Sequence, residues 1–263
     1  MRILARYLGH GLTAEQIWAA NGSNEVMLHV LLAFAGPGRR VLSFAPTYSM
    51  YPEYARDTHS EWCTLPRRDD FTIDPDAAVT AMLETRPDVV LITSPNNPTG
   101  TAVSLATIRA ICDVASGVVV VDEAYYEFAR GGTPSALELL PQLSAACGEP
   151  DHVEGLCLRR RAARLPAAAP AFIDALQIVR LPYHLSALTQ AAARVALAHA
   201  PEMLAEGRSA SAGPRRPGPL ARQSWTRGCR IRRQLRPLRA VRQSARGLAG
   251  PARPRGSDSR DRT

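Results

Sequence analysis

Short apolar runs alternate with helical patterns over the first half of the chain. Residues 40–44, 88–93 and 117–122 are apolar, rich in β-branched side chains and short enough to be buried strands. Residues 25–34 and 102–115 have the spacing of helices. This alternation is typical of βαβ units. We therefore predict an α/β fold, with a three-layer α/β/α large domain and a mostly parallel sheet.

The pattern changes in the second half. Residues 144–166 have no periodicity, and neither a strand nor a helix fits them well. Residues 172–176 and 186–197 fit two helices on either side of a break at Leu181-Pro182-Tyr183. The end of the chain is dominated by Arg, Pro, Gly, Ser and Ala, which predicts disorder. The predicted segments are a large domain (1–142), an altered segment (143–166), further large-domain or interdomain helices (167–205) and a tail (206–263).

The net charge of +8 is distributed unevenly. The chain has no lysine, and the tail from residue 206 holds 16 of the 32 arginines but only three acidic residues. Over the preceding residues, acidic side chains outnumber arginines, as in an ordinary soluble enzyme. Such a tail could be a nucleic-acid-binding arm, but Trp225 is its only aromatic residue, so this interpretation is less favoured.

Several other classes of protein are not indicated. No apolar run approaches 18 residues, and the N-terminus lacks the apolar segment and cleavage site of a signal peptide. The five cysteines have no paired CxxC spacing, which argues against a zinc site or a disulfide framework. We expect a cytoplasmic protein with free thiols, no metal and no membrane contact.

Three segments carry candidate chemistry, and each lies after a predicted strand or opens a predicted helix. Residues 21–25 (NGSNE) place a glycine and small polar side chains at a helix N-terminus, which favours an anion site, although a plain cap by Ser23 or Asn24 would look the same. Residues 94–100 (SPNNPTG) form a turn that leaves an asparagine amide facing the crevice. Residues 118–125 deliver Asp122 at the end of an apolar strand, with Tyr125 three residues later. A buried carboxylate of this kind needs a cationic partner, which a protonated pyridine nitrogen would provide.

Together these motifs resemble those of histidinol-phosphate aminotransferases, members of the class I/II, fold type I aminotransferases that use pyridoxal 5'-phosphate (PLP). The resemblance covers residues 4–142 and returns over residues 167–205. Residues 46–51 (PTYSMY) are similar to the family segment that bears a ring-stacking tyrosine. The resemblance implies transfer of an amino group between histidinol phosphate and 2-oxoglutarate. It also implies a homodimer with its site at the subunit interface.

The resemblance assigns a role to each candidate residue. Ser23 and Asn24 would hold the cofactor phosphate, and Tyr48 would stack on the ring. Asn97 and Tyr125 would bond the phenolic oxygen, and Asp122 would pair with the ring nitrogen. His184, in a segment that also resembles the family, is expected to be a structural or interface residue.

The chain departs from the family at the catalytic lysine. The family has a Ser-Lys motif in the stretch that here spans residues 148–166, with the Schiff-base lysine expected near Glu154 and Gly155. Residues 149–156 can be encoded as GAG CCG GAC CAT GTC GAA GGC CTT, which, shifted by one nucleotide, reads Ser-Arg-Thr-Met-Ser-Lys-Ala-Phe. The arginine-rich tail yields family-like sequence in the same way. We infer frame disruptions near Leu143 and near Ala205.

Other features leave alternatives open. The family has an N-terminal arm ahead of the position of Met1, so we expect a chain truncated at both ends, with an incomplete small domain. Aromatic-amino-acid aminotransferases share the cofactor residues and are an alternative for the substrate. A chain without the lysine could also be a non-catalytic, pseudogene-like product, because that lysine both anchors the cofactor and moves the substrate proton.

Overall fold

The computed structural model describes residues 1–126, 129, 131–141, 156–161 and 163–202, with the backbone alone described for residues 156–161 and 163–166. The chain divides into two compact units, Met1–Ser211 and Ala212–Thr263, and only the first contains described residues. The predicted disordered tail and positions 154 and 155 therefore lie outside the described residues.

A six-stranded sheet runs through the first unit in the order β2-β1-β3-β4-β5-β6. All neighbouring strands are parallel except the last pair, β5 and β6. The strands are β1 (Arg40–Ala45), β2 (Glu61–Pro66), β3 (Val89–Thr93), β4 (Val118–Glu123), β5 (Leu156–Arg161) and β6 (Ala163–Ala167). The three predicted strands are confirmed as β1, β3 and β4.

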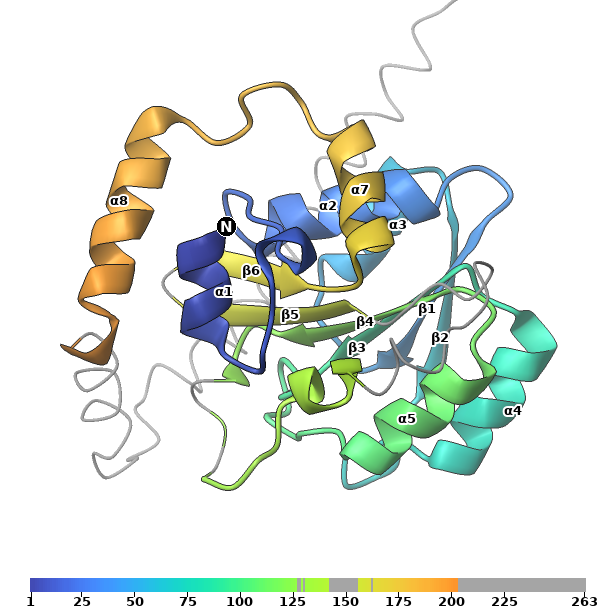
Figure 1. Cartoon of the computed structure of the whole chain (residues 1–263). Helices are drawn as coiled ribbons and strands as arrows, with labels where there is room; N and C mark the ends of the chain where they lie inside the picture. The colour runs from blue at the N-terminus through green and yellow to red at the C-terminus, as the bar shows by residue number, and fades with distance from the viewer. Residues whose placement is uncertain (127–128, 130, 142–155, 162, 203–263) are drawn as a thin grey trace, which may run out of the picture. The chain divides into compact units, whose positions relative to one another are not determined.

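Helices pack on both faces of this sheet (Figure 1). They are α1 (Arg2–Leu8), α2 (Ser23–Phe34), α3 (Tyr51–Asp57), α4 (Pro75–Thr85), α5 (Leu105–Val114), α7 (Pro170–Val179) and α8 (Ala187–Ala198), with short 3-10 turns η1 (Ala14–Gln16) and η3 (Ala136–Glu138). The two helices predicted for the first half are present as α2 and α5, and the two predicted for the second half are present as α7 and α8. Among the described residues, no helix is both long and apolar enough to cross a membrane.

Alternation along the strands creates two cores. Val119 and Val121 point into a cluster with α1, α4 and α5, whereas Val118 and Val120 point into a second cluster with α2, α3 and α7. β3 and β4 are buried along their whole length, as expected of central parallel strands covered on both faces. The three-layer α/β/α prediction is thereby confirmed.

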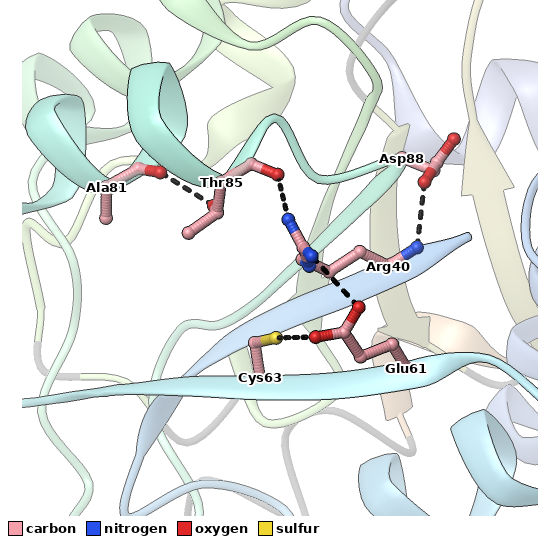
Figure 2. A network of polar contacts seen from close by, with 6 residues as sticks. All are labelled: Arg40, Glu61, Cys63, Ala81, Thr85 and Asp88. Carbon is pink, nitrogen blue, oxygen red and sulfur yellow. Dashed lines mark hydrogen bonds and ion pairs between the residues drawn. The ribbon is translucent and has the colours of Figure 1, made fainter. Parts of the chain in front are cut away.

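Polar contacts join the amino ends of the first three strands (Figure 2). The backbone N–H of Arg40 donates to Asp88 Oδ2 at 2.8 Å, and the Arg40 guanidinium pairs with Glu61 Oε2 at 2.9 Å and donates to the carbonyl of Thr85. Cys63 contacts the other oxygen of Glu61. This network fixes the starts of β1, β2 and β3 at the edge of the sheet away from their carboxyl ends.

We expected no regular element in residues 144–166. This expectation is wrong from residue 156 onward, where β5 and β6 form. Residues 156–161 pair with β4 in parallel, and residues 163–167 return antiparallel as β6. The free edge of β4 supplies backbone partners, and such pairing does not require a periodic side-chain pattern. Residues 143–155 lie outside the described residues.

Candidate functional site

The candidate residues converge at the carboxyl edge of the sheet. β1, β3 and β4 are adjacent and parallel, so the segments that follow Ala45, Thr93 and Glu123 begin side by side. Ligands of open α/β sheets bind beyond this edge. The residues predicted from sequence in the last two of these segments, Asn97 and Tyr125, therefore belong to one place in the fold.

Asp122 is a buried residue near the carboxyl end of β4, at this edge of the sheet. It is only 4% exposed, and its two carboxylate oxygens accept hydrogen bonds from different groups. The Tyr51 hydroxyl donates to Oδ2 at 2.9 Å, and the backbone N–H of Ala124 donates to Oδ1 at 3.0 Å. Hydrogen bonds to an ionised carboxylate favour its charged form, so this side chain is held ready for a cationic partner.

The neighbouring carboxylate serves the fold instead. Glu123 is also buried, but its Oε2 accepts from the Ser135 hydroxyl and its Oε1 from the backbone N–H of Ala136, both at 2.7 Å. These contacts fasten η3 to the end of β4. Only Asp122 of the pair is thus directed toward Tyr51.

The two asparagines of the SPNNPTG loop have different partners. Asn96 is buried, and its amide donates to the carbonyl of Pro46 at 3.1 Å and to Thr99 Oγ1 at 2.8 Å, which ties this loop to the one after β1. Asn97 is half-buried, and its Nδ2 donates to the Tyr125 hydroxyl at 3.2 Å. The first asparagine braces the loop, and the second joins Tyr125 at the edge of the sheet.

The predicted anion site lies at the start of α2. Gly22 precedes the helix with a φ of 107°, a conformation that favours glycine, and Ser23 and Asn24 are its first two residues. The Tyr48 hydroxyl donates to Asn24 Oδ1 at 3.4 Å, so the stacking-tyrosine candidate reaches the helix N-terminus. Glu25 accepts hydrogen bonds from the backbone and side chain of Asn21. Neither Ser23 nor Asn24 is the residue that caps the helix.

His184 joins a cluster behind α2. Its ring stacks on Trp18 with centroids 5.2 Å apart, and its Nε2 lies 2.9 Å from the carbonyl of Ala19. Trp18 Nε1 donates to Nδ1 of the buried His29 at 3.3 Å. The cluster connects α2 to the segment between α7 and α8.

One residue of the site was missed from sequence. Tyr51 lies three residues after Tyr48 within the same PTYSMY segment, and the two rings meet edge to face with centroids 5.6 Å apart. Its partner Asp122 is 71 residues away in the sequence. A buried tyrosine opening a helix reads as a core residue, and only the fold brings it to the carboxylate.

Comparison with known families identifies the chain. Residues 2–212 match the family described as aminotransferase class I and II. The chain is a member of this family. Its described site residues lie within the matched range.

Known relatives are histidinol-phosphate aminotransferases. The chain is 54% identical over 201 residues to the enzyme of Thermobifida fusca, an alignment of 76% of this chain and 55% of the relative. It is 51% identical over 216 residues to histidinol-phosphate aminotransferase 3 of Burkholderia lata, covering 77% and 56% of the two chains. The chain thus spans about half the length of the curated relatives it matches.

Solved structures agree on the fold. Histidinol-phosphate aminotransferase from Sinorhizobium meliloti, in complex with pyridoxal-5'-phosphate, aligns with a TM-score of 0.65 at 22% identity, over 78% of this chain and 55% of that one. N-Succinyldiaminopimelate aminotransferase from Mycobacterium tuberculosis also gives 0.65 at 22% identity, covering 80% and 58%. The sheet described here is therefore that of fold type I aminotransferases.

Proposed function

We propose that the carboxyl-edge site binds PLP and that the chain represents a histidinol-phosphate aminotransferase. The observation that carries this proposal is the buried Asp122 carboxylate, held by Tyr51 and the Ala124 N–H beside the Asn97–Tyr125 pair. The choice of substrate is supported by the names of relatives about half identical to the chain.

The donor and acceptor chemistry of the site fits this cofactor. A buried carboxylate matches a protonated ring nitrogen, and the Asn97 amide and Tyr125 hydroxyl match a phenolic oxygen. The N-terminus of α2, with Ser23 and Asn24, matches a phosphate. Tyr48, half-buried between Asn24 and Tyr51, offers an aromatic face.

Each group would act on a different part of the reaction. Bound PLP supplies an electron sink for loss of the substrate's α-proton. Asp122 would keep a proton on the ring nitrogen, and Asn97 and Tyr125 would orient the phenolic oxygen. The base that would move the α-proton is missing, because the chain contains no lysine. We therefore infer that the chain as given binds cofactor without covalent anchorage and does not transfer amino groups.

The frame inference is tested by sequencing the gene across the codons for residues 143–166. An added or missing nucleotide that restores the Ser-Lys motif would mean that the encoded protein is a competent aminotransferase. Confirmation of the given sequence would instead predict no transamination of histidinol phosphate by the purified chain. Measurable transamination by the chain as given would overturn the inferred inactivity.

The cofactor proposal is tested by equilibrium dialysis of the full chain against PLP. We expect saturable binding, weakened about tenfold by Asn97→Ala, because one hydrogen bond to a charged oxygen is lost. Thermal unfolding should be nearly unchanged in that variant, since Asn96 and not Asn97 braces the loop. Equal affinity of the two proteins, or no binding by either, would contradict the assignment.

We further propose a cytoplasmic homodimer. Several large apolar side chains on α7, α8 and their connection are exposed, and a second copy of the chain would cover some of them; they are Ile178, Leu181, Tyr183, Leu188 and Val195. Sedimentation velocity of the purified chain distinguishes a dimer from a monomer.

A further inference from the structure

Tyr51 has a polar environment that its position in the core does not require. It is the first residue of α3, its side chain is fully buried, and its ring packs in the cluster between the sheet and α2, α3 and α7. A tyrosine at such a place usually bonds any convenient acceptor. Here the hydroxyl lies against the one carboxylate expected to meet the cofactor ring.

The hydrogen bonds around Tyr51 have a fixed direction. Thr93 Oγ1 donates to the Tyr51 oxygen at 3.0 Å, and the Tyr51 hydroxyl donates to Asp122 Oδ2 at 2.9 Å. Thr47 Oγ1 lies 3.2 Å from Thr93 Oγ1 and extends the chain of contacts to the loop after β1. Burial, followed by the nearby charge of Asp122, raises the pKa of Tyr51 well above its ordinary value. The phenol therefore stays protonated and acts as a permanent donor.

Among the described residues, the buried titratable groups that lie close to Tyr51 or to Asp122 include Tyr54, Arg67 and Glu123. Tyr54, one turn along α3, interacts with it electrostatically. Arg67, just after β2, is 8% exposed, and burial lowers its pKa to about 10, with an opposing contribution from Tyr51. Arg67 donates to the carbonyls of Phe44 and Phe71. Glu123 is turned toward Ser135 and Ala136. Of these groups, Tyr51 is the one that bonds Asp122 directly.

Tyr51 also touches the predicted stacking residue. Its ring meets that of Tyr48 edge to face, so one side chain contacts both the residue proposed for the face of the cofactor and the residue proposed for its nitrogen. A displacement of Tyr51 would disturb both. The geometry couples the two contacts through a single rigid ring.

We propose that Tyr51 is a positioning residue that fixes the orientation of Asp122 and keeps its carboxylate ionised for a protonated ring nitrogen. The inference rests on the proposed cofactor site and deepens it. Removing a donor from a buried carboxylate disfavours its charged form, so the proton affinity of Asp122 should rise. A neutral Asp122 cannot pair with a pyridinium. The loss should therefore appear at the acid end of the pH range.

The direct test follows the titration of Asp122 in the full chain. Aspartate labelled with carbon-13 at the side-chain carboxyl is observed by NMR, and Asp122→Asn identifies the resonance. In Tyr51→Phe we expect the titration midpoint to move to higher pH by about one pH unit or more. Tyr54→Phe is the matched control, because it removes the same group from the same helix and leaves the Tyr51–Asp122 hydrogen bond in place.

Binding of PLP is measured on the same proteins between about pH 5 and 8. The acid limb of the binding curve should move upward with the Asp122 midpoint, with about tenfold weaker binding near that midpoint in Tyr51→Phe. An unchanged midpoint in folded Tyr51→Phe would overturn the proposal. A raised midpoint together with no PLP binding by the wild type would refute the cofactor site while leaving the action of Tyr51 on Asp122 established.

A second variant decides the matter if Tyr51→Phe does not fold. Thr93→Val keeps the ring in place and removes the hydroxyl that donates to the phenol oxygen. That donor strengthens the phenol's own bond to Asp122, so its loss should raise the midpoint in the same direction by a smaller amount. An unchanged Asp122 midpoint in this variant would argue against transmission of the effect from Thr93 through Tyr51 to Asp122.

Discussion

At the scale of single residues, the cluster behind α2 places a titratable group where its charge is unfavourable. His29 is 5% exposed, and burial lowers its pKa, with smaller effects from Glu25 in the opposite direction and from His184 and Arg180 in the same direction. Its Nδ1 accepts a hydrogen bond from Trp18 Nε1, which can only donate. Protonation of His29 at Nδ1 would place its N–H opposite the N–H of Trp18, so that two hydrogen-bond donors would face each other.

This geometry predicts a loss of stability in acid. The folded pKa lies below the unfolded value of about 6.5, so the folded state binds the proton less readily than the unfolded state. The contribution is complete above about pH 6.5 and is lost as the pH falls toward the folded pKa. Urea midpoints should therefore fall between pH 8 and pH 5, and less so in His29→Gln, whose amide oxygen can still accept from Trp18.

The exposed His10 provides the control for this measurement. His10→Gln removes an imidazole from the surface of the same unit and leaves the Trp18–His29 hydrogen bond in place. Equal pH slopes in the wild type and His29→Gln would contradict the role given to His29.

Some residues of the site could be identified from sequence motifs alone, and others could not. Asn97, Asp122 and Tyr125 were singled out because they lie at or just after the carboxyl ends of two buried strands, in the motifs of residues 94–100 and 118–125. Tyr51 was not singled out, because its bond to Asp122, 71 residues away, depends on where the fold places the start of α3. The different tasks of Asn96 and Asn97 were partly visible, since the resemblance singled out only the second.

At the scale of elements, the start of β4 depends on a glycine. A β-carbon on Gly117 would lie 2.2 Å from the carbonyl oxygen of Asp88 and 2.6 Å from that of Pro87. Both are backbone atoms just before β3, so neither can move aside as a flexible side chain could. Gly117→Ala should lower the free energy of unfolding by about 1–3 kcal/mol, measured by urea denaturation.

Gly131 offers a matched change without the clash. Its added β-carbon would meet nothing within 4 Å, and Gly131→Ala should stay within about 0.5 kcal/mol of the wild type. Similar destabilisation by both changes would indicate that contact with residues 87–88 is not the cause.

The strands differ in how visible they are in the sequence. β3 and β4 are continuous apolar runs buried on both faces, and they were predicted nearly to the residue. β2 is half-exposed and carries Glu61 and Cys63 within a short edge strand, so it has no comparable run. β5 and β6 were missed because β5 pairs with the free edge of β4 and β6 pairs with β5, and this backbone pairing requires no periodic side-chain pattern. Helix α4 had a usable signal in Asp74, which caps it by accepting from the N–H groups of Asp76 and Ala77.

At the scale of the first unit, the later helices complete the core built by the earlier ones. Phe172 on α7 stacks on Phe34 at the end of α2, with ring centroids 4.6 Å apart, and is 3% exposed. Phe172→Ala should lower the free energy of unfolding by about 3–5 kcal/mol, because a large buried ring leaves a cavity. Gln177 on the same helix is exposed, and Gln177→Ala should change the free energy of unfolding by less than about 0.5 kcal/mol. Chemical denaturation of both variants checks this, and equal effects would mean that α7 does not dock through Phe172.

The fold class of this unit could be predicted from the alternation of strand and helix patterns along the sequence. The packing of α7 against α2 could not. Amphipathic spacing predicts that a helix buries one face and does not identify its partner. The contact between residues 34 and 172 joins segments on either side of the stretch where the predicted pattern fails.

The two acidic residues that end β4 make strand length a stricter requirement than strand composition. Asp122 and Glu123 are adjacent but have different hydrogen-bond partners. Asp122 bonds Tyr51, and Glu123 bonds Ser135 and Ala136. Conservative exchanges among the valines before them would preserve this division. An insertion or deletion of one codon within the strand would exchange the two faces, bringing the longer Glu123 to the Tyr51 side. The position of Asp122 therefore depends on the number of residues before it in β4 as well as on their type.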